Sequence, residues 1–150
     1  MKVFMVFAAL LLAGAGFMGY QGDLNRYVHA QMVLKEACEE CASAAALFIN
    51  EEAYAEGLIV FDREKGRSYA EEYLDMLLSK RRSIETKDAV IRLKFKDDAS
   101  NDFSFTEAEY AYDTAAVSCE IELETGDLFG SPFISVTSLR RRACYELRTL

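Results

Sequence analysis

The chain opens with a long apolar run that passes directly into an amphipathic pattern. No charged residue occurs from Val3 to Tyr20, and no Pro separates this run from the charged residues that follow. From Asp23 onward, apolar and small residues recur at three- and four-residue intervals, the spacing of one helix face. The pattern therefore predicts a single helix from Val3 to about Asn50, roughly 70 Å long at the standard rise.

The amphipathic part of this helix has a predicted contact face. Gln31 is its one polar member, and an Ala-rich stretch from Ala42 to Ala46 would let a neighbouring element pack closely. The other members of the face are Tyr27, Leu34, Cys38, Cys41, Ala45 and Phe48. We expect this face to meet either the rest of the chain or a partner helix.

Two later segments alternate between apolar and polar residues with a period of two, which is typical of half-buried strands. They are "AVIRLKFKDD" from Ala89 and "AVSCEIELE" from Ala116. Their polar faces carry opposite charges, with Arg92, Lys94 and Lys96 on the first and Glu120, Glu122 and Glu124 on the second. Antiparallel pairing of the two strands would gain roughly 0.2–1 kcal/mol for each matched pair.

The remaining elements complete an α+β prediction. The segment "SYAEEYLDMLLSKRR" reads as a second amphipathic helix, with Ser68 as its cap and Glu71 three residues further on. A last strand is expected in "ISVTSLRRRACYEL", and the segment from Phe103 to Tyr112 fits a strand or a helix. The expected fold is a long N-terminal helix packed on a small antiparallel sheet, with the second helix as cover.

The apolar run has three interpretations. As a helix it would be about 27 Å long, just enough to cross the hydrocarbon core of a bilayer. Lys2 before the run places the N-terminus in the cytoplasm and the rest of the chain outside. The run also resembles a secretory signal peptide, with Ala13-Gly14-Ala15 as its cleavage site, or it could be buried in a soluble core. We favour a retained anchor because Phe17, Met18 and Tyr20 extend the apolar run beyond that cleavage site.

Small residues recur one helical turn apart along the run, at Ala9, Ala13 and Gly16. Such a stripe allows another helix to approach closely. Gly and Ala are also frequent in membrane helices that have no such partner.

Charge and composition exclude several classes of function. The net charge is −8, so a nucleic-acid partner is not expected. Arg140, Arg141 and Arg142 form a basic cluster in the body, and the simplest expectation is that they pair with Glu on neighbouring strands. With one His and no nucleophile motif, the sequence predicts no catalytic residue, cofactor, metal site or small-molecule substrate.

Four Cys residues suggest disulfides if the body is exported, because an even count in an oxidising compartment favours pairing. Cys38 and Cys41 form a C-x-x-C on the contact face, Cys119 lies on an inward strand position, and Cys144 is the fourth. We expect links that join the long helix to the sheet, with Cys144 the least suited by strand parity. Two alternatives are a redox motif at Cys38 and Cys41, and a zinc site made by all four.

The stretch "GDLNRYVHAQMVLKEACEECASAAALFIN" resembles the start of TadE/TadG-like proteins of tight-adherence (Tad/Flp) pilus systems. In that family a membrane span leads into Asp, Arg and Tyr and then an Ala-rich helix. The matching positions are Asp23, Arg26, Tyr27, Gln31, Leu34, Ala37 and the run from Ala42 to Ala46. The resemblance covers about the first third of the chain. The start Met1-Lys2-Val3 lacks the Gly that prepilin peptidases require before the apolar run, so a resident membrane component is expected rather than a major pilin.

The resemblance implies a non-enzymatic, pilin-like structural or assembly component of a surface pilus or secretion apparatus. Residues 1–22 would form the transmembrane anchor and residues 23–150 the extracytoplasmic domain, with membrane lipid and other pilin-like proteins as partners. Two further hypotheses are a secreted, disulfide-linked binding module released by cleavage near Ala15, and an extracytoplasmic thiol oxidoreductase that uses Cys38 and Cys41.

Overall fold

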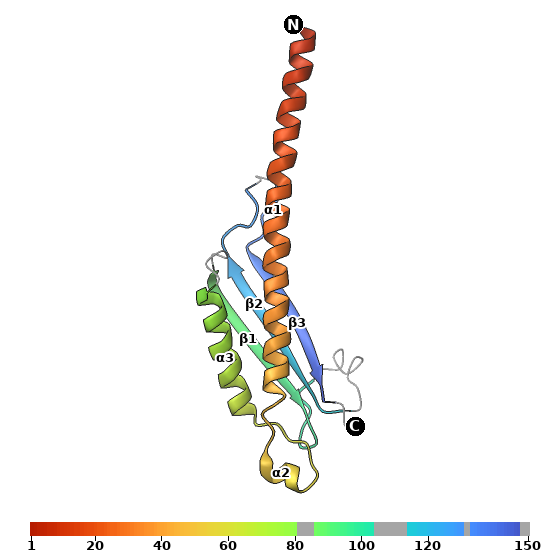
Figure 1. Cartoon of the computed structure of the whole chain (residues 1–150), viewed down its shortest axis with the longest axis vertical. Coiled ribbons are helices and arrows are strands. Elements are labelled where there is room, and N and C mark those ends of the chain that lie inside the picture. Colours follow the sequence, from red (N-terminus) through yellow and green to blue (C-terminus); the bar gives the residue numbers. More distant parts are fainter. Residues whose placement is uncertain (81–85, 104–113, 131–132, 148–150) are drawn as a thin grey trace.

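The computed structural model describes residues 1–80, 86–103, 114–130 and 133–147. Within them, one long helix is followed by a short helix, a third helix and three strands (Figure 1). The elements are α1 (Lys2–Ala45), α2 (Glu51–Ala55), α3 (Arg63–Lys80), β1 (Thr86–Lys96), β2 (Ala116–Thr125) and β3 (Ser138–Glu146).

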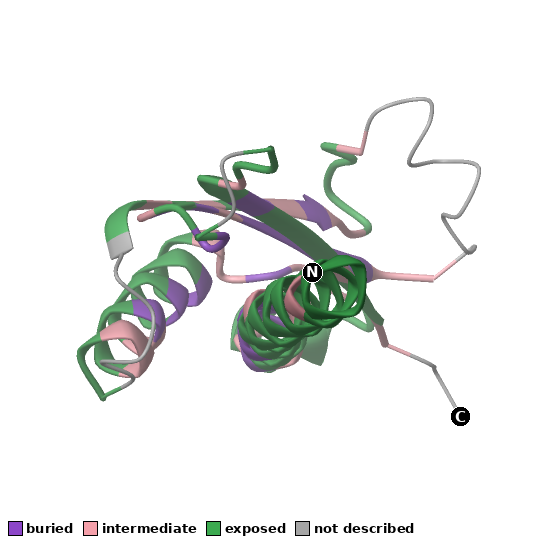
Figure 2. Ribbon diagram, turned by 90° about the horizontal axis from the view of Figure 1, so that it is seen from above, coloured by how far each residue is buried: buried purple, intermediate pink, exposed green. Residues whose placement is uncertain are grey.

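The three strands form one antiparallel sheet in the order β1-β2-β3. Both long helices lie on the same side of this sheet, as the view from above shows (Figure 2). The opposite side of the sheet is covered by no helix in the described part of the chain. The α+β expectation is therefore confirmed as a two-layer arrangement, with a long apolar N-terminal helix, a small sheet and another helix.

The pairing of β1 with β2 follows the expected charge pattern. Arg92 stands directly opposite Glu120 in an antiparallel register, and the β2–β3 register places Glu120 opposite Arg142. The inward side chains of the strands make the core together with α1 and α3; Phe95, Ile121, Leu123 and Leu139 are almost completely buried there. Burial of a side chain of this size contributes about 1.5–3 kcal/mol.

The long helix ends earlier than the sequence pattern predicts. It stops at Ala45 because the following backbone pairs with a later segment: the Asp62 N–H donates to the Phe48 carbonyl (2.7 Å) and the Asn50 N–H to the Val60 carbonyl (2.8 Å). The separate helix α2 then begins, and the Asn50 side chain accepts hydrogen bonds from the Glu52 and Ala53 N–H groups. The prediction of one helix reaching Asn50 was too long by about one turn.

The start of the second amphipathic helix was also predicted too late. α3 begins at Arg63, and Asp62 is its capping residue, since the Asp62 carboxylate accepts from the Lys65 N–H at 3.1 Å. Ser68 therefore lies inside the helix and does not cap it. The last strand begins at Ser138 instead of Ile134. Nearly all of the ambiguous segment from Phe103 to Tyr112 lies outside the described residues.

A glycine allows α3 to lie close to α1. A Cβ at Gly66 would come within 3.4 Å of the Ala45 Cβ and of the Phe95 Cζ. A methyl group would thus just be in contact with Ala45 and Phe95, and a larger side chain at this position would not fit between the two helices and β1.

Candidate functional site

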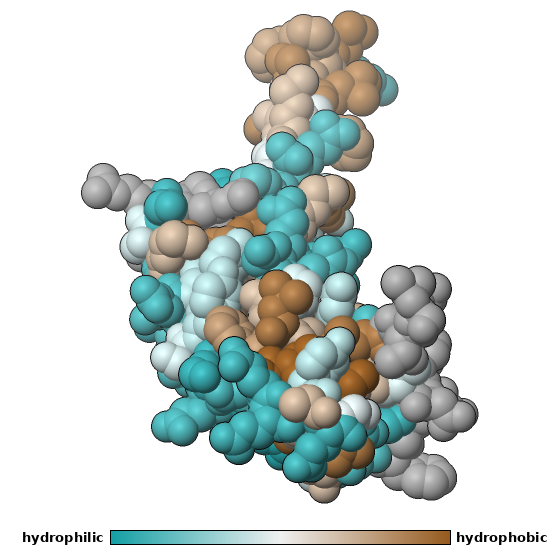
Figure 3. Space-filling view, turned by 60° about the horizontal axis from the view of Figure 1, so that its bottom comes forward, coloured by the Kyte–Doolittle hydropathy of each residue, from teal (hydrophilic) through white to brown (hydrophobic). Residues whose placement is uncertain are grey.

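The N-terminal half of α1 extends beyond the rest of the molecule and makes no core there. Its large apolar side chains are exposed, among them Phe4 (73%), Leu10 (67%) and Leu12 (76%). It is the one helix among the described residues that is long and apolar enough to cross a membrane, and none of its most apolar window is buried. Figure 3 shows this apolar end standing above the body, whose visible face has hydrophilic residues around a central hydrophobic patch. The body of the chain therefore does not bury this half of the helix, and an anchor and a signal sequence both fit.

The C-terminal half of α1 has the opposite surroundings. Ala37, Cys38, Cys41, Ala42 and Ala45 are each 0% exposed, because this half packs on β2, β3 and α3. Small side chains on this face let the sheet approach the helix backbone. The predicted contact face is therefore occupied by the chain's own body.

The predicted helix-packing residues fall into two groups that do not meet. Leu34 and Ala45 lie in the core, Tyr27 packs against its edge, and Phe48 packs on Tyr69 with ring centroids 5.7 Å apart. Of the small residues of the apolar run, Ala9 and Ala13 are exposed, and Gly16 has nothing within 4 Å of an added Cβ. The stripe of Ala9, Ala13 and Gly16 contacts no part of the body.

A cluster of contacts fixes the body to α1 immediately below the apolar half. The Gly130 N–H donates to the Asp23 carboxylate (2.9 Å), and Arg26 lies 3.5 Å from the same carboxylate. The Phe129 ring packs against Tyr20 and Tyr27, at 6.2 and 6.0 Å between centroids. Deeper along the helix, the Arg141 guanidinium donates to the Gln31 side chain. We call Tyr20, Asp23, Tyr27, Phe129 and Gly130 the junction cluster.

Sequence reasoning missed the part of the junction cluster that comes from the β2–β3 loop. The residue that could have indicated this loop is Asp127. Its carboxylate accepts hydrogen bonds from the Phe129 N–H and the Val136 N–H, both at 3.0 Å. These backbone hydrogen bonds, and one from Ser135, lower the pKa of Asp127. An Asp followed two residues later by an aromatic residue thus makes a compact turn that presents Phe129 to the helix.

The uncovered side of the sheet has an acidic centre between basic strands. Glu120 is 7% exposed and accepts hydrogen bonds from Arg140 (2.7 Å), Arg142 (2.8 Å) and Arg92 (3.1 Å). Burial raises the pKa of Glu120, and the hydrogen bonds from the three guanidinium groups outweigh that effect and bring it to about 2. The expectation that the arginine cluster pairs with Glu on neighbouring strands is confirmed for Arg140 and Arg142.

Three of the four cysteines converge between α1 and the sheet. Cys38, Cys41 and Cys119 are all 0% exposed, and the thiol of Cys119 interacts with those of both helix cysteines. Hydrogen bonding to Cys38 and Cys41, together with burial, raises the pKa of Cys119. Cys144 is exposed on the other side of the sheet, directly opposite Ser118. All four are reduced thiols in the structure, so neither of the two expected disulfides is formed.

The two helix cysteines differ from the surroundings expected of a redox motif in their place on the helix, although the hydrogen bond with Cys119 lowers the pKa of Cys38. Cys38 and Cys41 lie in the middle of α1 and not at a helix N-terminus, and they donate to the Arg141 and Ala70 carbonyls in the core. Across the described ranges, no group of three or more His, Cys, Asp or Glu residues is arranged to hold a metal ion.

No family model, no curated protein and no solved structure matches the chain.

Proposed function

We propose that the protein is a non-enzymatic, pilin-like structural or assembly component of a Tad-type surface pilus or secretion apparatus. In this proposal α1 is retained and spans the cell membrane once, with Lys2 on the cytoplasmic side and the body outside the cytoplasm. Membrane lipid and other pilin-like proteins are its partners.

The continuity of α1 carries the proposal. One unbroken helix from Lys2 to Ala45 is bare and apolar in its first half and buried against a sheet in its second. A helix that only filled a soluble core would be covered along its length, and an anchor joined by a linker would not position the body. Continuity instead holds the body at a fixed distance and orientation from the bilayer.

The residues that carry the resemblance to TadE/TadG-like proteins support the proposal through their contacts. Asp23 and Tyr27 belong to the junction cluster, and Gln31 links the helix to Arg141 of β3. In this chain these residues fix the body directly against the helix where it emerges from the proposed membrane span.

Deletion of the protein in its native host tests the proposal. We expect loss of surface filaments, or of the material exported by the apparatus, when cells are examined by electron microscopy and surface shearing. Complementation with the wild-type chain should restore them, and complementation with Leu12→Arg should not, because an Arg at the centre of a span opposes insertion by about 2.5–3.5 kcal/mol. Unchanged filaments and export in the deletion strain would reject the proposed role.

A secreted binding module is the second candidate, and the exposure of residues 1–15, which lie outside the core, favours it. Cleavage after Ala15 would remove no contact of the core, since the junction cluster begins at Tyr20. N-terminal sequencing of the mature protein separates the candidates: a start at Gly16 selects the secreted module, and an intact N-terminus selects the anchor.

For the exported body, the disulfide expectation narrows to one bridge between Cys119 and either Cys38 or Cys41. Cys144 is on the opposite side of the sheet and cannot join it. Oxidation would release two protons and pass two electrons to a thiol–disulfide oxidoreductase of the exporting compartment. Alkylation of the denatured, unreduced protein should then modify two cysteines, and modification of all four would exclude the bridge.

A further inference from the structure

The side of α1 that faces away from the body carries its own repeat. Residues that are apolar except for one Gln recur at four- and three-residue intervals along it, which is the a/d spacing of a left-handed coiled coil, and from Tyr20 to Val28 this side stays uncharged while other sides of the helix become charged. The repeat consists of Val3, Phe7, Leu10, Gly14, Phe17, Gln21, Leu24 and Val28, which we call the outer seam. Its large apolar members are exposed, from Val3 at 83% to Val28 at 39%.

The outer seam and the body lie on opposite sides of the helix. At 100° per residue, the seam is centred about 150° around the helix axis from the buried residues Ala30, Leu34, Ala37 and Cys41. A second helix on the seam would therefore meet neither the sheet nor α3.

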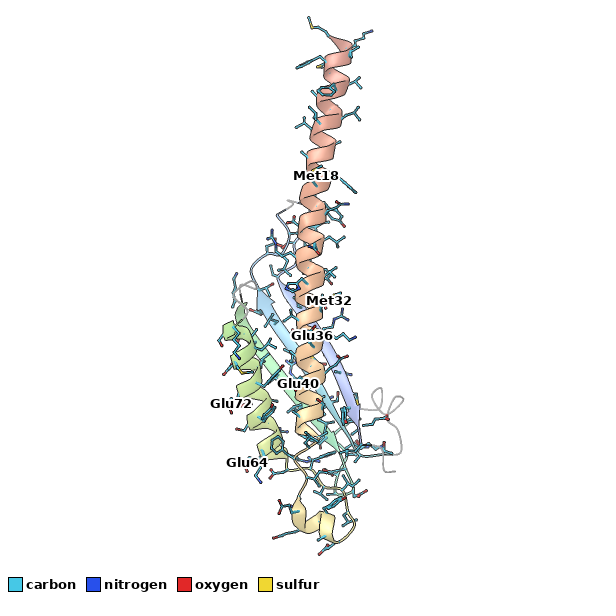
Figure 4. All side chains as sticks on the ribbon, in the orientation of Figure 1. Met18, Met32, Glu36, Glu40, Glu64 and Glu72 are labelled. Carbon is cyan, nitrogen blue, oxygen red and sulfur yellow. The ribbon has the colours of Figure 1, made fainter. Side chains whose placement is uncertain are left out.

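The seam continues beyond the part of α1 that lipid can cover. Leu24, Val28 and the neighbouring Met32 lie roughly 6–18 Å past Tyr20 along the axis, and they are 40%, 39% and 59% exposed. Met32 and Met18 border the seam on the same flank and are labelled in Figure 4. Water alone would cover these side chains unless another apolar surface packs on them.

Charged side chains avoid the seam and both of its flanks. Asp23 and Arg26 project from other sides of α1, and so does His29, which directly follows Val28. The first charge on the seam line is Lys35, which forms a 3.5 Å ion pair with Glu39 of its own helix. Identical helices could thus align in parallel without like charges meeting until Lys35, where repulsion would end the contact.

From this pattern we propose that the outer seam pairs with the outer seam of a second copy, as a parallel two-stranded coiled coil from Val3 to Val28. Parallel pairing keeps both N-termini on one side of the membrane and places the bodies on opposite sides of the pair. The two Gln21 side chains then face each other at an a position near the membrane boundary, where a polar pair fixes register.

The contact area is small for a pair of helices and limits where the pair can form. The seam is about 38 Å long, and a strip about 10 Å wide on each copy gives roughly 800 Å² in total. Stable interfaces in solution begin near 1,200 Å², so the pair should form within the plane of a membrane and be weak in detergent. The proposal rests on the membrane insertion stated under the proposed function.

Cysteine cross-linking of the full-length chain in membranes tests the seam. In a Cys144→Ser background, Val28→Cys is compared with His29→Cys, a matched neighbour at nearly the same depth but on another side of the helix. Mild oxidation should yield several-fold more disulfide-linked dimer for Val28→Cys, because a positions face each other in a parallel pair. Adding Val28→Asp to a Leu24→Cys chain should abolish its dimer, and adding His29→Asp should not.

Equal yields for Val28→Cys and His29→Cys, or no dimer from either, would overturn the proposal. The second outcome would assign the seam to lipid or to a protein of different sequence. Flotation of the same samples with vesicles separates this failure from failure of the anchor: chains that float without forming dimers reject the seam alone, and chains that do not float reject the membrane role.

Discussion

The bare half of α1 and the body differ in what their apolar residues contact, although one helix runs through both. In the first half, Phe4, Leu10 and Leu12 are mostly exposed. In the body, Ala37, Cys41 and Ala45 of the same helix are completely enclosed. Both regions are helical, but their apolar side chains are stabilised differently. In the body they are covered by the sheet and α3, whereas those of the bare half need lipid or another molecule to cover them.

The largest expected difference comes from one substitution made in each region. Ala37→Arg would bury an unpaired charge, which costs several kcal/mol and should unfold the body. Leu12→Arg should leave the body folded, because Leu12 contacts nothing there, but should remove the chain from the membrane. Circular dichroism melting and membrane fractionation of both variants check this. A Leu12→Arg chain with an unfolded body would contradict the independence of the two regions.

Glu120→Gln should lower the free energy of unfolding of the body by about 1–3 kcal/mol, because three guanidinium groups would lose the carboxylate that they share. Glu122→Gln is the matched control, because the Glu122 side chain is more exposed and lies 3.3 Å from Arg92, and the substitution should cost less than about 0.5 kcal/mol. Urea unfolding of both variants measures the difference, and equal losses would contradict the central role of Glu120.

The same carboxylate predicts how stability depends on pH. The folded pKa of Glu120, about 2, is below the ordinary value of 4.5, so its contribution is present above pH 5 and is lost as the pH falls toward 2. Urea midpoints of the wild type should fall across this window, and Glu120→Gln should reduce the fall. Membrane attachment should persist throughout, because the bare half of α1 has no acidic group.

A glycine in each region gives a smaller contrast. Gly66→Val would place a branched side chain within contact distance of Ala45 and Phe95 and should destabilise the body by about 1–3 kcal/mol. A Cβ at Gly19 would have nothing within 4 Å, so Gly19→Val should leave the melting temperature of the body unchanged. Thermal melts of both variants decide this, and equal shifts would mean that the body also packs around Gly19.

The smallest effect concerns the thiols. A thiol reagent applied to the folded protein should modify Cys144 and leave the three buried cysteines unmodified, whether or not Cys119 is bridged. Mass spectrometry after brief labelling counts the modified sites. Rapid modification of Cys38 or Cys41 would show that α1 separates readily from the sheet.

Local patterns predicted the elements well and their partners less well. The period of two and the opposite charges gave the β1–β2 pairing correctly, because side chains on adjacent strands contact each other directly. The face with Leu34 and Cys38 was also correct as a contact face, but periodicity cannot say whether a face meets its own sheet or another molecule. In the structure that face packs against the body. The opposite side of α1 remains exposed and carries the outer seam.

The errors came from competing local signals and from distant contacts. Ser68 has the composition of a cap, yet Asp62 precedes it and caps the helix first. The end of α1 is set by pairing between residues 48–50 and 60–62, which no helical pattern contains. The junction cluster was missed for a similar reason, since Phe129 and Asp23 are far apart in sequence. Convergence of Cys119 with the C-x-x-C was foreseen from its strand parity, whereas parity could not decide whether a bond forms.

Flotation of the full-length protein with phospholipid vesicles, followed by an alkaline carbonate wash, tests the central claim most directly. If the first half of α1 is held by lipid while the second half belongs to the body, the intact chain floats with the vesicles and stays there after the wash. A chain with an intact N-terminus that remains folded and soluble beside the vesicles would contradict the account.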